Sequence, residues 1–420
     1  MITRTKLLPG VYLTAIRTDK FKTGCFSVNL LRPLKREEAA MNALLPSVLL
    51  RGTVKHPDLR SMALALEQLY GTELSSTIRK KGEVQTTGLF ADFIEDALVG
   101  SEILRPAVSL CAEVLLQPVL DGGVFRADYV AQEKENLCNA IRSAINSKRT
   151  YAVLQTVKTM CANEPYGVSR LGEVEDVETI TTESLYAHYR NILETSRIEI
   201  CYLGRQDEKT VAALFTDAFA ALPRGSLTQI GITPNAPVTQ VREKSERLDV
   251  TQGKLCMGFR LAETAADDNW AANLMMNTVF GSGVTSKLFL NVREKLSLCY
   301  YASSSLEKFK GVMLVDSGIE FGNADVTRTE ILRQLDDCRS GAITDEEMDS
   351  ARKHLLSVWR AALDSPSQTD EYYLGCAILG STKTMTDVIA ELETVTKEQT
   401  VAAANGVTLD TVYFLKGLET

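Results

Sequence analysis

An arginine and a tyrosine seven positions apart, Arg293 and Tyr300, carry side chains that could bind a peptide. A guanidinium group can grip a backbone carbonyl with two parallel donors. A tyrosine hydroxyl can donate a hydrogen bond to the oxyanion that forms when a carbonyl is attacked. Taken singly, an arginine on an amphipathic helix is usually solvated and a strand tyrosine usually packs. Their role therefore depends on the segment that holds them.

That segment is Phe280–Ala302, with the sequence FGSGVTSKLFLNVREKLSLCYYA. A Gly/Ser turn leads into an amphipathic helix expected over 285–296, followed by a strand over 298–306. The segment resembles the second-half signature of the pitrilysin/insulinase-type zinc peptidases, G-x-x-S-[RK]-L-F-x-x-[VI]-R-E-x-x-x-L-x-Y. In that family the arginine and tyrosine help to hold the substrate over a zinc site built in the first half. The resemblance implies substrate-binding roles for Arg293 and Tyr300.

Active members of this family carry H-x-x-E-H, whose two histidines share one helical face and bind Zn²⁺ while the glutamate activates water. A Gly-Thr pair often follows this motif at a fixed offset, and Gly52-Thr53 resembles it. Counting back places the motif at 43–47, with the sequence ALLPS. Ala43 cannot bind zinc and Ser47 is a poor ligand. Pro46 has no proton chemistry and would kink the helix.

The remaining candidate ligands do not restore a metal site. The downstream glutamate of the family aligns with Ala140, and Glu133 and Glu135 alone cannot hold zinc. The chain has three histidines, none within helical reach of another, at His56, His188 and His354. Each is expected to be a surface or packed histidine. We therefore expect no metal and no catalytic residue in this chain.

Composition sets further bounds. A chain of 420 residues is too long for one ordinary core, so two or more domains are expected. The net charge of −8 without a long basic run argues against nucleic acid or an anionic membrane as partner. No apolar run approaches the ~18–20 residues that span a bilayer. The N-terminus lacks an apolar signal core, and nine scattered cysteines without a C-x-x-C pair suit reduced thiols in the cytoplasm.

The two halves share one pattern of expected elements. Strands at 10–16 and 25–30 open the first half, and a strand at 254–260 opens the second. Helices follow at 36–50 and 57–70, and at 268–279 and 285–296. Strand pairs come next at 72–80 with 83–92, and at 298–306 with 310–319. Long helices then dominate at 122–146 and 344–363.

This repeat predicts an α+β fold with two homologous domains, at 1–222 and 247–420. Each is expected to be an antiparallel sheet with helices packed on one face. The stretch 223–246 holds Pro, Gly, Thr and Ser without periodicity and is interpreted as a linker. The family resemblance implies that the domains form a half-clamshell.

One strand could pair with a peptide. Gly71–Ser76 resembles the family's edge strand, often G-G-x-L-N-A, to which substrate adds by backbone pairing in active members. Ser75 and Ser76 replace the Asn-Ala pair. An ordinary edge strand without this function is the alternative.

The resemblance implies a non-catalytic subunit of a heterodimeric zinc peptidase that cleaves short unfolded peptides. Arg293 and Tyr300 would act beside a homologous partner that carries the zinc motif, so zinc is expected in the partner. Such a chain would be inactive alone. Two alternatives stay open: a structural or scaffold subunit, and a peptide-binding homodimer without peptidase activity. A neighbouring gene for a homologue with intact H-x-x-E-H would favour the peptidase pair.

Overall fold

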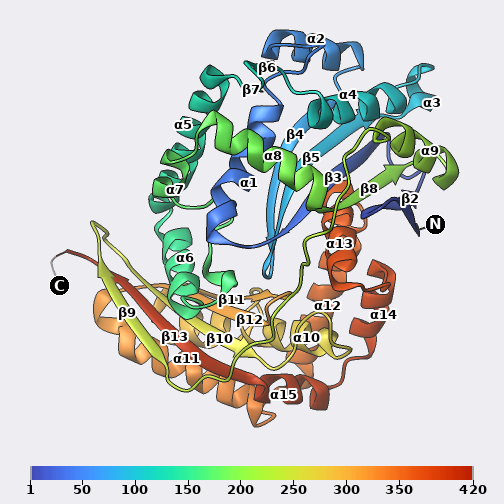
Figure 1. Cartoon of the computed structure of the whole chain (residues 1–420). Coiled ribbons are helices and arrows are strands. Elements are labelled where there is room, and N and C mark those ends of the chain that lie inside the picture. The colour runs from blue at the N-terminus through green and yellow to red at the C-terminus, as the bar shows by residue number, and fades with distance from the viewer. Residues whose placement is uncertain (1, 419–420) are drawn as a thin grey trace. The chain divides into compact units, whose positions relative to one another are not determined.

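The computed structural model describes residues 2–418, and the chain forms two compact units (Figure 1). The first unit contains the chain up to Arg142, together with Val168–Gly231 and Ser365–Ile378. The second contains Ser143–Gly167, Ile232–Asp364 and the chain from Leu379 onward. Each unit thus includes a segment from the opposite half of the sequence. The domain limits 1–222 and 247–420 stay a prediction.

A six-stranded sheet lies in the first unit, with the order β1-β2-β8-β3-β5-β4. Its strands are β1 (Ile2–Leu8), β2 (Val11–Arg17), β3 (Thr23–Pro33), β4 (Glu73–Lys81), β5 (Val84–Ile94) and β8 (Arg197–Gly204). Neighbouring strands are antiparallel except β2 and β8, which are parallel. A small hairpin of β6 (Leu120–Asp121) and β7 (Val124–Phe125) lies outside this sheet.

The second unit repeats this topology in a five-stranded sheet. Its strands are β9 (Arg242–Arg247), β10 (Gly253–Leu261), β11 (Cys299–Glu307), β12 (Val312–Ile319) and β13 (Val407–Lys416). The order β9-β13-β10-β12-β11 matches β2-β8-β3-β5-β4 strand for strand, including one parallel pair, β9 with β13. The α+β fold with two homologous sheets is confirmed. Among residues 2–418, strand β1 has no counterpart in the second sheet.

Helices of the first unit cover its sheet mainly on one face. They are α1 (Arg36–Leu49), α2 (Leu59–Gln68), α3 (Asp96–Val99), α4 (Leu104–Leu116), α5 (Ala127–Ser143), α7 (Val174–Glu178), α8 (Thr182–Thr195) and α9 (Glu208–Ala218). Because side chains alternate along a strand, Phe26 and Val28 of β3 enter the main core. Ser27 points to the other face, where it bonds Asp370 of α13 (Pro366–Leu379).

The second sheet is covered in the same way. Its helices are α6 (Lys148–Met160), α10 (Trp270–Phe280), α11 (Ala324–Arg339), α12 (Asp345–Ala362), α14 (Met385–Thr394) and α15 (Lys397–Asn405). Short 3₁₀ turns lie at η1 (Ala144–Asn146), η2 (Pro165–Gly167) and η4 (Phe321–Asn323). Met257 and Phe259 of β10 enter the main core. Cys256, between Leu255 and Met257, packs instead with Ala152 of α6.

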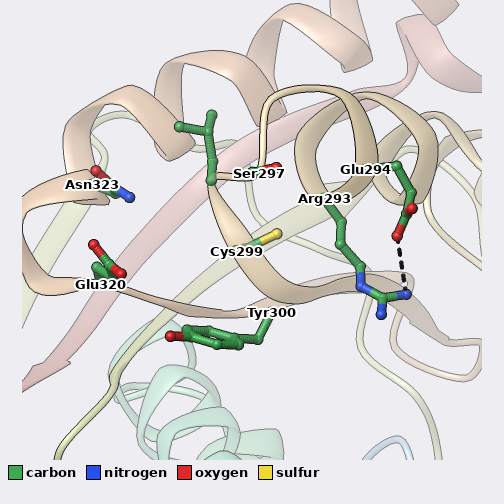
Figure 2. A pocket seen from close by; sticks show the side chains of 8 residues that line it. Arg293, Glu294, Ser297, Cys299, Tyr300, Glu320 and Asn323 are labelled. Carbon is green, nitrogen blue, oxygen red and sulfur yellow. Dashed lines mark ion pairs between the residues drawn. The ribbon is translucent and has the colours of Figure 1, made fainter.

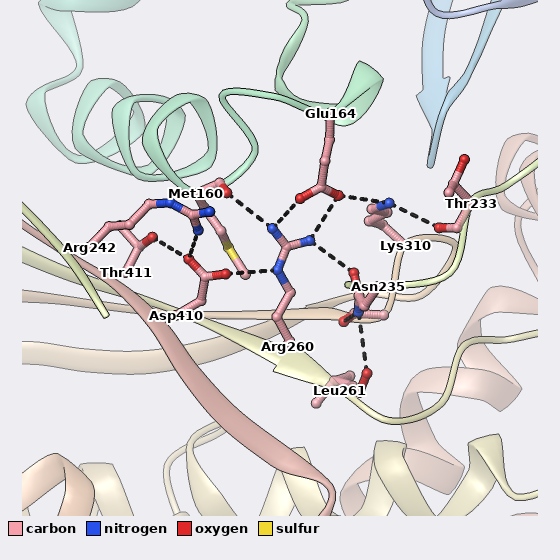
Figure 3. Close-up of polar contacts among 11 residues, drawn as sticks. Met160, Glu164, Thr233, Asn235, Arg242, Arg260, Leu261, Lys310, Asp410 and Thr411 are labelled. Atoms are coloured by element: carbon pink, nitrogen blue, oxygen red, sulfur yellow. Dashed lines mark hydrogen bonds and ion pairs between the residues drawn. The ribbon is translucent and has the colours of Figure 1, made fainter. Parts of the chain in front are cut away.

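A buried charge network fastens α6 and residues before β9 to this sheet (Figure 3). The Arg260 guanidinium on β10 donates to Glu164, just after α6, and to Asp410 on β13. It also donates to Asn235 in the segment interpreted as a linker, with 2.9 Å between the heavy atoms. Lys310 contacts Glu164 and the carbonyl of Thr233, each at 2.9 Å. These bonds satisfy the charges that burial would otherwise leave isolated.

Most expected elements are present, and the differences have physical causes. The helix expected over 285–296 is a π-helix at η3 (Leu288–Lys295), where Leu296 N–H bonds the Asn291 carbonyl. No disulfide joins the nine cysteines, which all lie within residues 2–418, and eight of them are buried, as expected. No helix among residues 2–418 has the length and apolar character needed to cross a membrane.

Candidate functional site

The segment aligned with the zinc motif lies in α1 and faces the core. Ala43 and Pro46 are buried, and Ser47 is half-buried. Neither Ala43 nor Pro46 has a side-chain donor atom that could reach a metal. The residues present therefore do not fit a zinc ion, because Zn²⁺ requires nitrogen, sulfur or carboxylate ligands.

A polar network occupies the core beside this segment. The Asn42 side chain donates to Gln85 over 2.8 Å, and its Oδ1 lies 2.7 Å from Nε2 of His188. Since Asn42 Oδ1 can only accept, His188 is the donor. Burial lowers the pKa of His188 to about 4, against a weaker raising effect of Glu38. His188 is thus a neutral core histidine whose Nε2 is engaged by Asn42.

The downstream carboxylates do not converge on α1 as ligands. Glu133 on α5 forms an ion pair with Arg51. Glu135 and Ala140, on the same helix, are exposed. Within residues 2–418, His, Cys, Asp and Glu side chains form no group of three that could hold a metal ion.

The Arg293 side of the second candidate site is built by the π-helix η3. π-Helical turns are rare and are frequently found at functional sites. Arg293 lies in the last turn, 39% exposed, with its guanidinium 4.6 Å from the ring centre of Phe289. It is also 3.5 Å from the carboxylate of Glu294. The guanidinium is thus positioned but keeps donors open to solvent.

Tyr300 is placed by a β-bulge in edge strand β11. Cys299 pairs with Ile319 of β12, while Tyr301 pairs with Gly318, so Tyr300 is the extra residue. Bulges redirect side chains and are common near active sites. The Tyr300 side chain is 63% exposed. Its neighbour Tyr301 is half-buried, with the Arg149 guanidinium 4.4 Å from its ring centre.

Arg293 and Tyr300 line one open cavity of about 450 Å³ (Figure 2). The lining residues are Arg293, Glu294, Ser297, Leu298, Cys299, Tyr300, Glu320 and Asn323. Ser297 has a left-handed backbone with φ of 50°, a conformation that costs energy for residues other than glycine and is often kept at functional sites. The two residues singled out in the sequence are therefore brought together in space.

The cavity contains no activated nucleophile among the residues that line it. Burial raises the pKa of the Cys299 thiol to about 11, although nearby Arg293 opposes this shift. The thiol therefore stays protonated at neutral pH and is a poor nucleophile. What the cavity offers is hydrogen-bond donors from Arg293 and Tyr300 and an acceptor from Glu320. These groups can bind and orient a peptide.

The segment Gly71–Ser76 was expected to form an edge strand, and its residues from Glu73 onward do so in β4. Strand β4 lies at the edge of the first sheet, and β5 is its one pairing strand within the described residues. Ser75 and Glu73 are exposed on it. Addition of a peptide to this edge stays a prediction.

Sequence reasoning missed Glu320, Asn323 and Ser297. Glu320 and Asn323 follow β12 in a Glu-Phe-Gly-Asn turn that resembles any strand end. Their position beside Tyr300 depends on the register of β11 against β12, which no local pattern gives. The sequence signal that could have pointed to these residues is the Glu-x-Gly-Asn turn directly after the strand expected over 310–319.

The fold and these sites define a metallopeptidase-like chain without the metal centre. A family model described as the peptidase M16 inactive domain matches residues 179–355. A probable inactive metalloprotease, YmfF of Bacillus subtilis, is 33% identical over 412 residues, covering 98% of this chain and 96% of that protein. An uncharacterised zinc protease, YmxG of the same organism, is 21% identical over 58% of this chain and 59% of its own length.

Solved structures share this fold. A conserved protein from Enterococcus faecalis has a TM-score of 0.92 at 28% identity, covering 100% of this chain and 99% of that one. The peptidase M16 inactive domain from Pseudomonas fluorescens has a TM-score of 0.83 at 16% identity, covering 99% and 98%. The chain belongs to the peptidase M16 family, the pitrilysin/insulinase-type metallopeptidases, as one of its inactive members.

Proposed function

We propose that this chain is the non-catalytic subunit of a heterodimeric zinc peptidase. In this proposal it supplies Arg293 and Tyr300 to a homologous partner that carries the zinc motif. The pair cleaves short unfolded peptides in the cytoplasm, and this chain binds no zinc itself. Its nine cysteines, which form no disulfide within residues 2–418, suit a reducing compartment.

The observation that carries the proposal is the shared cavity of Arg293 and Tyr300. A tyrosine ring that is 63% exposed on a bulged edge strand contributes little to the core. Its hydroxyl and the Arg293 guanidinium are open to a ligand that enters the cavity. The arginine is suited to hold a peptide carbonyl, and the tyrosine to donate to the oxygen that becomes negative during cleavage.

The chain's own residues explain why a partner is needed. The motif positions Ala43, Pro46 and Ser47 provide neither ligands nor a base for hydrolysis. A homologous chain with intact H-x-x-E-H would provide both. The purified chain alone is therefore expected to be inactive, and light scattering shows whether it is then a monomer or a homodimer.

The test is peptide cleavage by this chain, by its nearest zinc-motif homologue, and by the mixture. We expect cleavage to rise on mixing. In the mixture, Tyr300→Phe should lower kcat by about 10²-fold, the effect of removing one oxyanion donor, while assembly persists in size-exclusion chromatography.

Tyr301→Phe is the matched control, because it makes the same chemical change one residue away. The Tyr301 hydroxyl is buried and has no hydrogen-bond partner within the described part of the chain. If Tyr300→Phe behaves like Tyr301→Phe, the role of Tyr300 is wrong. If mixing gives no activity with any zinc-motif homologue, the chain acts as a scaffold or a peptide-binding homodimer instead.

A further inference from the structure

The Arg293 cavity has two chemically different ends (Figure 2). At one end the guanidinium of Arg293 lies beside Glu294, so this end offers hydrogen-bond donors whose positive charge is partly neutralised. At the other end Glu320 and Asn323 line the cavity. Figure 2 shows the hydroxyl of Tyr300 directed toward the Glu320 side, away from Arg293. A peptide bound along the cavity would therefore have the Arg293 guanidinium at one end, and the Glu320 carboxylate with the Tyr300 hydroxyl at the other.

Glu320 is held at this end by the backbone. It follows β12 directly, and the preceding residue, Ile319, pairs with Cys299. The carbonyl of Glu320 accepts a hydrogen bond from the N–H of Asn323 over 3.0 Å, which fixes the turn. The Cys299–Ile319 pair lies between the two residues, since Tyr300 follows Cys299 and Glu320 follows Ile319, and both residues line the cavity.

The Glu320 carboxylate is exposed and has no ion-pair partner among residues 2–418. Glu294, in contrast, has Arg293 within 3.5 Å. An ionised carboxylate only accepts hydrogen bonds, so a ligand group that complements Glu320 must be a donor and gains most if it is a cation. The cavity volume of about 450 Å³ lies at the lower end of ligand pockets, which suits one or two residues of a peptide.

We infer that Glu320 is a specificity-determining residue that binds an ammonium or guanidinium group of the peptide held by Arg293 and Tyr300. This inference rests on the proposed peptide-binding function. The cation is either a lysine or arginine side chain or a free α-amino terminus, which share the chemistry that Glu320 recognises. Because Glu320 is exposed, the preference is modest, about twofold to fivefold in Kd over a neutral group, as for a surface ion pair.

The test is fluorescence anisotropy of labelled, unstructured peptides on the purified full-length chain. Four peptides differ only in charge: a central lysine with acetylated N-terminus, a central norleucine with acetylated N-terminus, the norleucine peptide with a free N-terminus, and a central glutamate with acetylated N-terminus. The wild type should bind either the lysine peptide or the free-terminus peptide more tightly than the acetylated norleucine peptide. The peptide that binds more tightly than the acetylated norleucine peptide identifies the source of the cation. The glutamate peptide should bind most weakly.

Glu320→Gln should remove this ranking, so that all four peptides bind alike, and Glu320→Lys should favour the glutamate peptide. Glu346→Gln is the control, since Glu346 is exposed on α12 and does not line the cavity. An unchanged ranking in Glu320→Gln would overturn the role of Glu320 while leaving the peptide site in place. If no peptide binds the wild type, or if Arg293→Gln and Tyr300→Phe bind as the wild type does, the proposed function fails and this inference with it.

Discussion

The side-chain hydroxyl of Thr87 donates a hydrogen bond to the backbone carbonyl of Asn42, with 2.6 Å between the oxygens. In a regular helix that carbonyl accepts from the N–H four residues later. The residue at that position is Pro46, which has no N–H. Thr87 on β5 thus satisfies a buried acceptor that the proline leaves open. The motif alignment at 43–47 predicts that Pro46 corresponds to the catalytic glutamate of active members, so the replacement of that glutamate and this contact would be structurally linked.

Thr87→Val should therefore destabilise the first unit by about 1–3 kcal/mol, because it leaves the Asn42 carbonyl buried without a donor. Pro46→Ala restores the helical N–H, so Thr87→Val should cost about 1 kcal/mol less in that background. Urea unfolding followed by circular dichroism measures both. Thr86→Val is the control, since the Thr86 hydroxyl is buried without a hydrogen-bond partner in the described chain. Equal costs for Thr87→Val in both backgrounds would show that the two residues are not coupled.

Sequence patterns predicted the elements whose residues alternate or repeat locally. The strand expected over 254–260 and the helix expected over 344–363 coincide with β10 and α12, because each pattern depends on neighbours in sequence. The meeting of Arg293 and Tyr300 followed from a family signature rather than from spacing alone. The two side chains line one cavity, so they lie close together in space. Their role in binding a peptide stays a prediction.

Other features depend on long-range contacts that no local pattern contains. Strand β9 was missed because its sequence, REKSER, has no apolar alternation and its side chains are mostly exposed. The π-helix was expected as an α-helix, since both bring apolar residues to one side. The Thr87–Asn42 bond joins residues 45 positions apart. The register that brings Glu320 beside Tyr300 is likewise set by strand pairing.

The predicted absence of a zinc site can be measured directly. The purified chain should contain far less than stoichiometric zinc, and EDTA should leave its thermal midpoint unchanged. The reason is that Ala43 and Pro46 are buried and carry no metal-binding atoms. Elemental analysis and differential scanning calorimetry measure this, with an active H-x-x-E-H homologue as the positive control. Stoichiometric zinc, or cleavage by this chain alone that chelators abolish, would contradict the alignment of 43–47.

His188 should make stability depend on pH. Burial lowers the pKa of His188 to about 4, with Glu38 opposing and Arg32 reinforcing the shift, whereas an unfolded histidine has a pKa of about 6.5. Between pH ~4 and pH ~6.5 the unfolded chain binds a proton at this histidine more readily than the folded chain does. The contribution of neutral His188 to the stability of the fold is therefore complete above pH ~6.5 and is lost as the pH falls toward 4. The loss should approach about 3 kcal/mol of unfolding free energy.

Urea unfolding at several pH values from 7 to 4, followed by circular dichroism, measures this slope. His188→Gln removes the titrating group and should flatten the dependence in that window, although the variant is less stable at pH 7. His354→Gln is the matched control, because His354 is an exposed histidine on α12. A slope that His188→Gln does not change would assign the pH dependence to other groups.

Glu164→Gln should destabilise the second unit through the network of Figure 3. Burial alone would raise the pKa of Glu164, but bonds from Arg260 and Lys310 outweigh it and lower that pKa, so the carboxylate is charged at neutral pH. Removing the charge weakens the contact of 2.9 Å between Glu164 and Lys310, whose side chain is fully buried. Breaking a buried ion pair from one side costs about 3 kcal/mol or more. Because Glu164 follows α6, the loss should first loosen α6 from β10 and β13.

Tryptophan fluorescence is suited to this measurement, since the chain's two tryptophans, Trp270 and Trp359, both lie in the second unit. Glu393→Gln is the control: its partner Arg360 lies 3.0 Å away with both side chains half exposed, so its cost should stay below about 1 kcal/mol. Because the pKa of Glu164 is lowered on folding, its contribution should be present above an unfolded pKa of about 4.3 and decline as pH falls below that value. Equal costs for the two substitutions at pH 7 would mean that solvent replaces Glu164 in the network, and that other contacts hold α6 on the sheet.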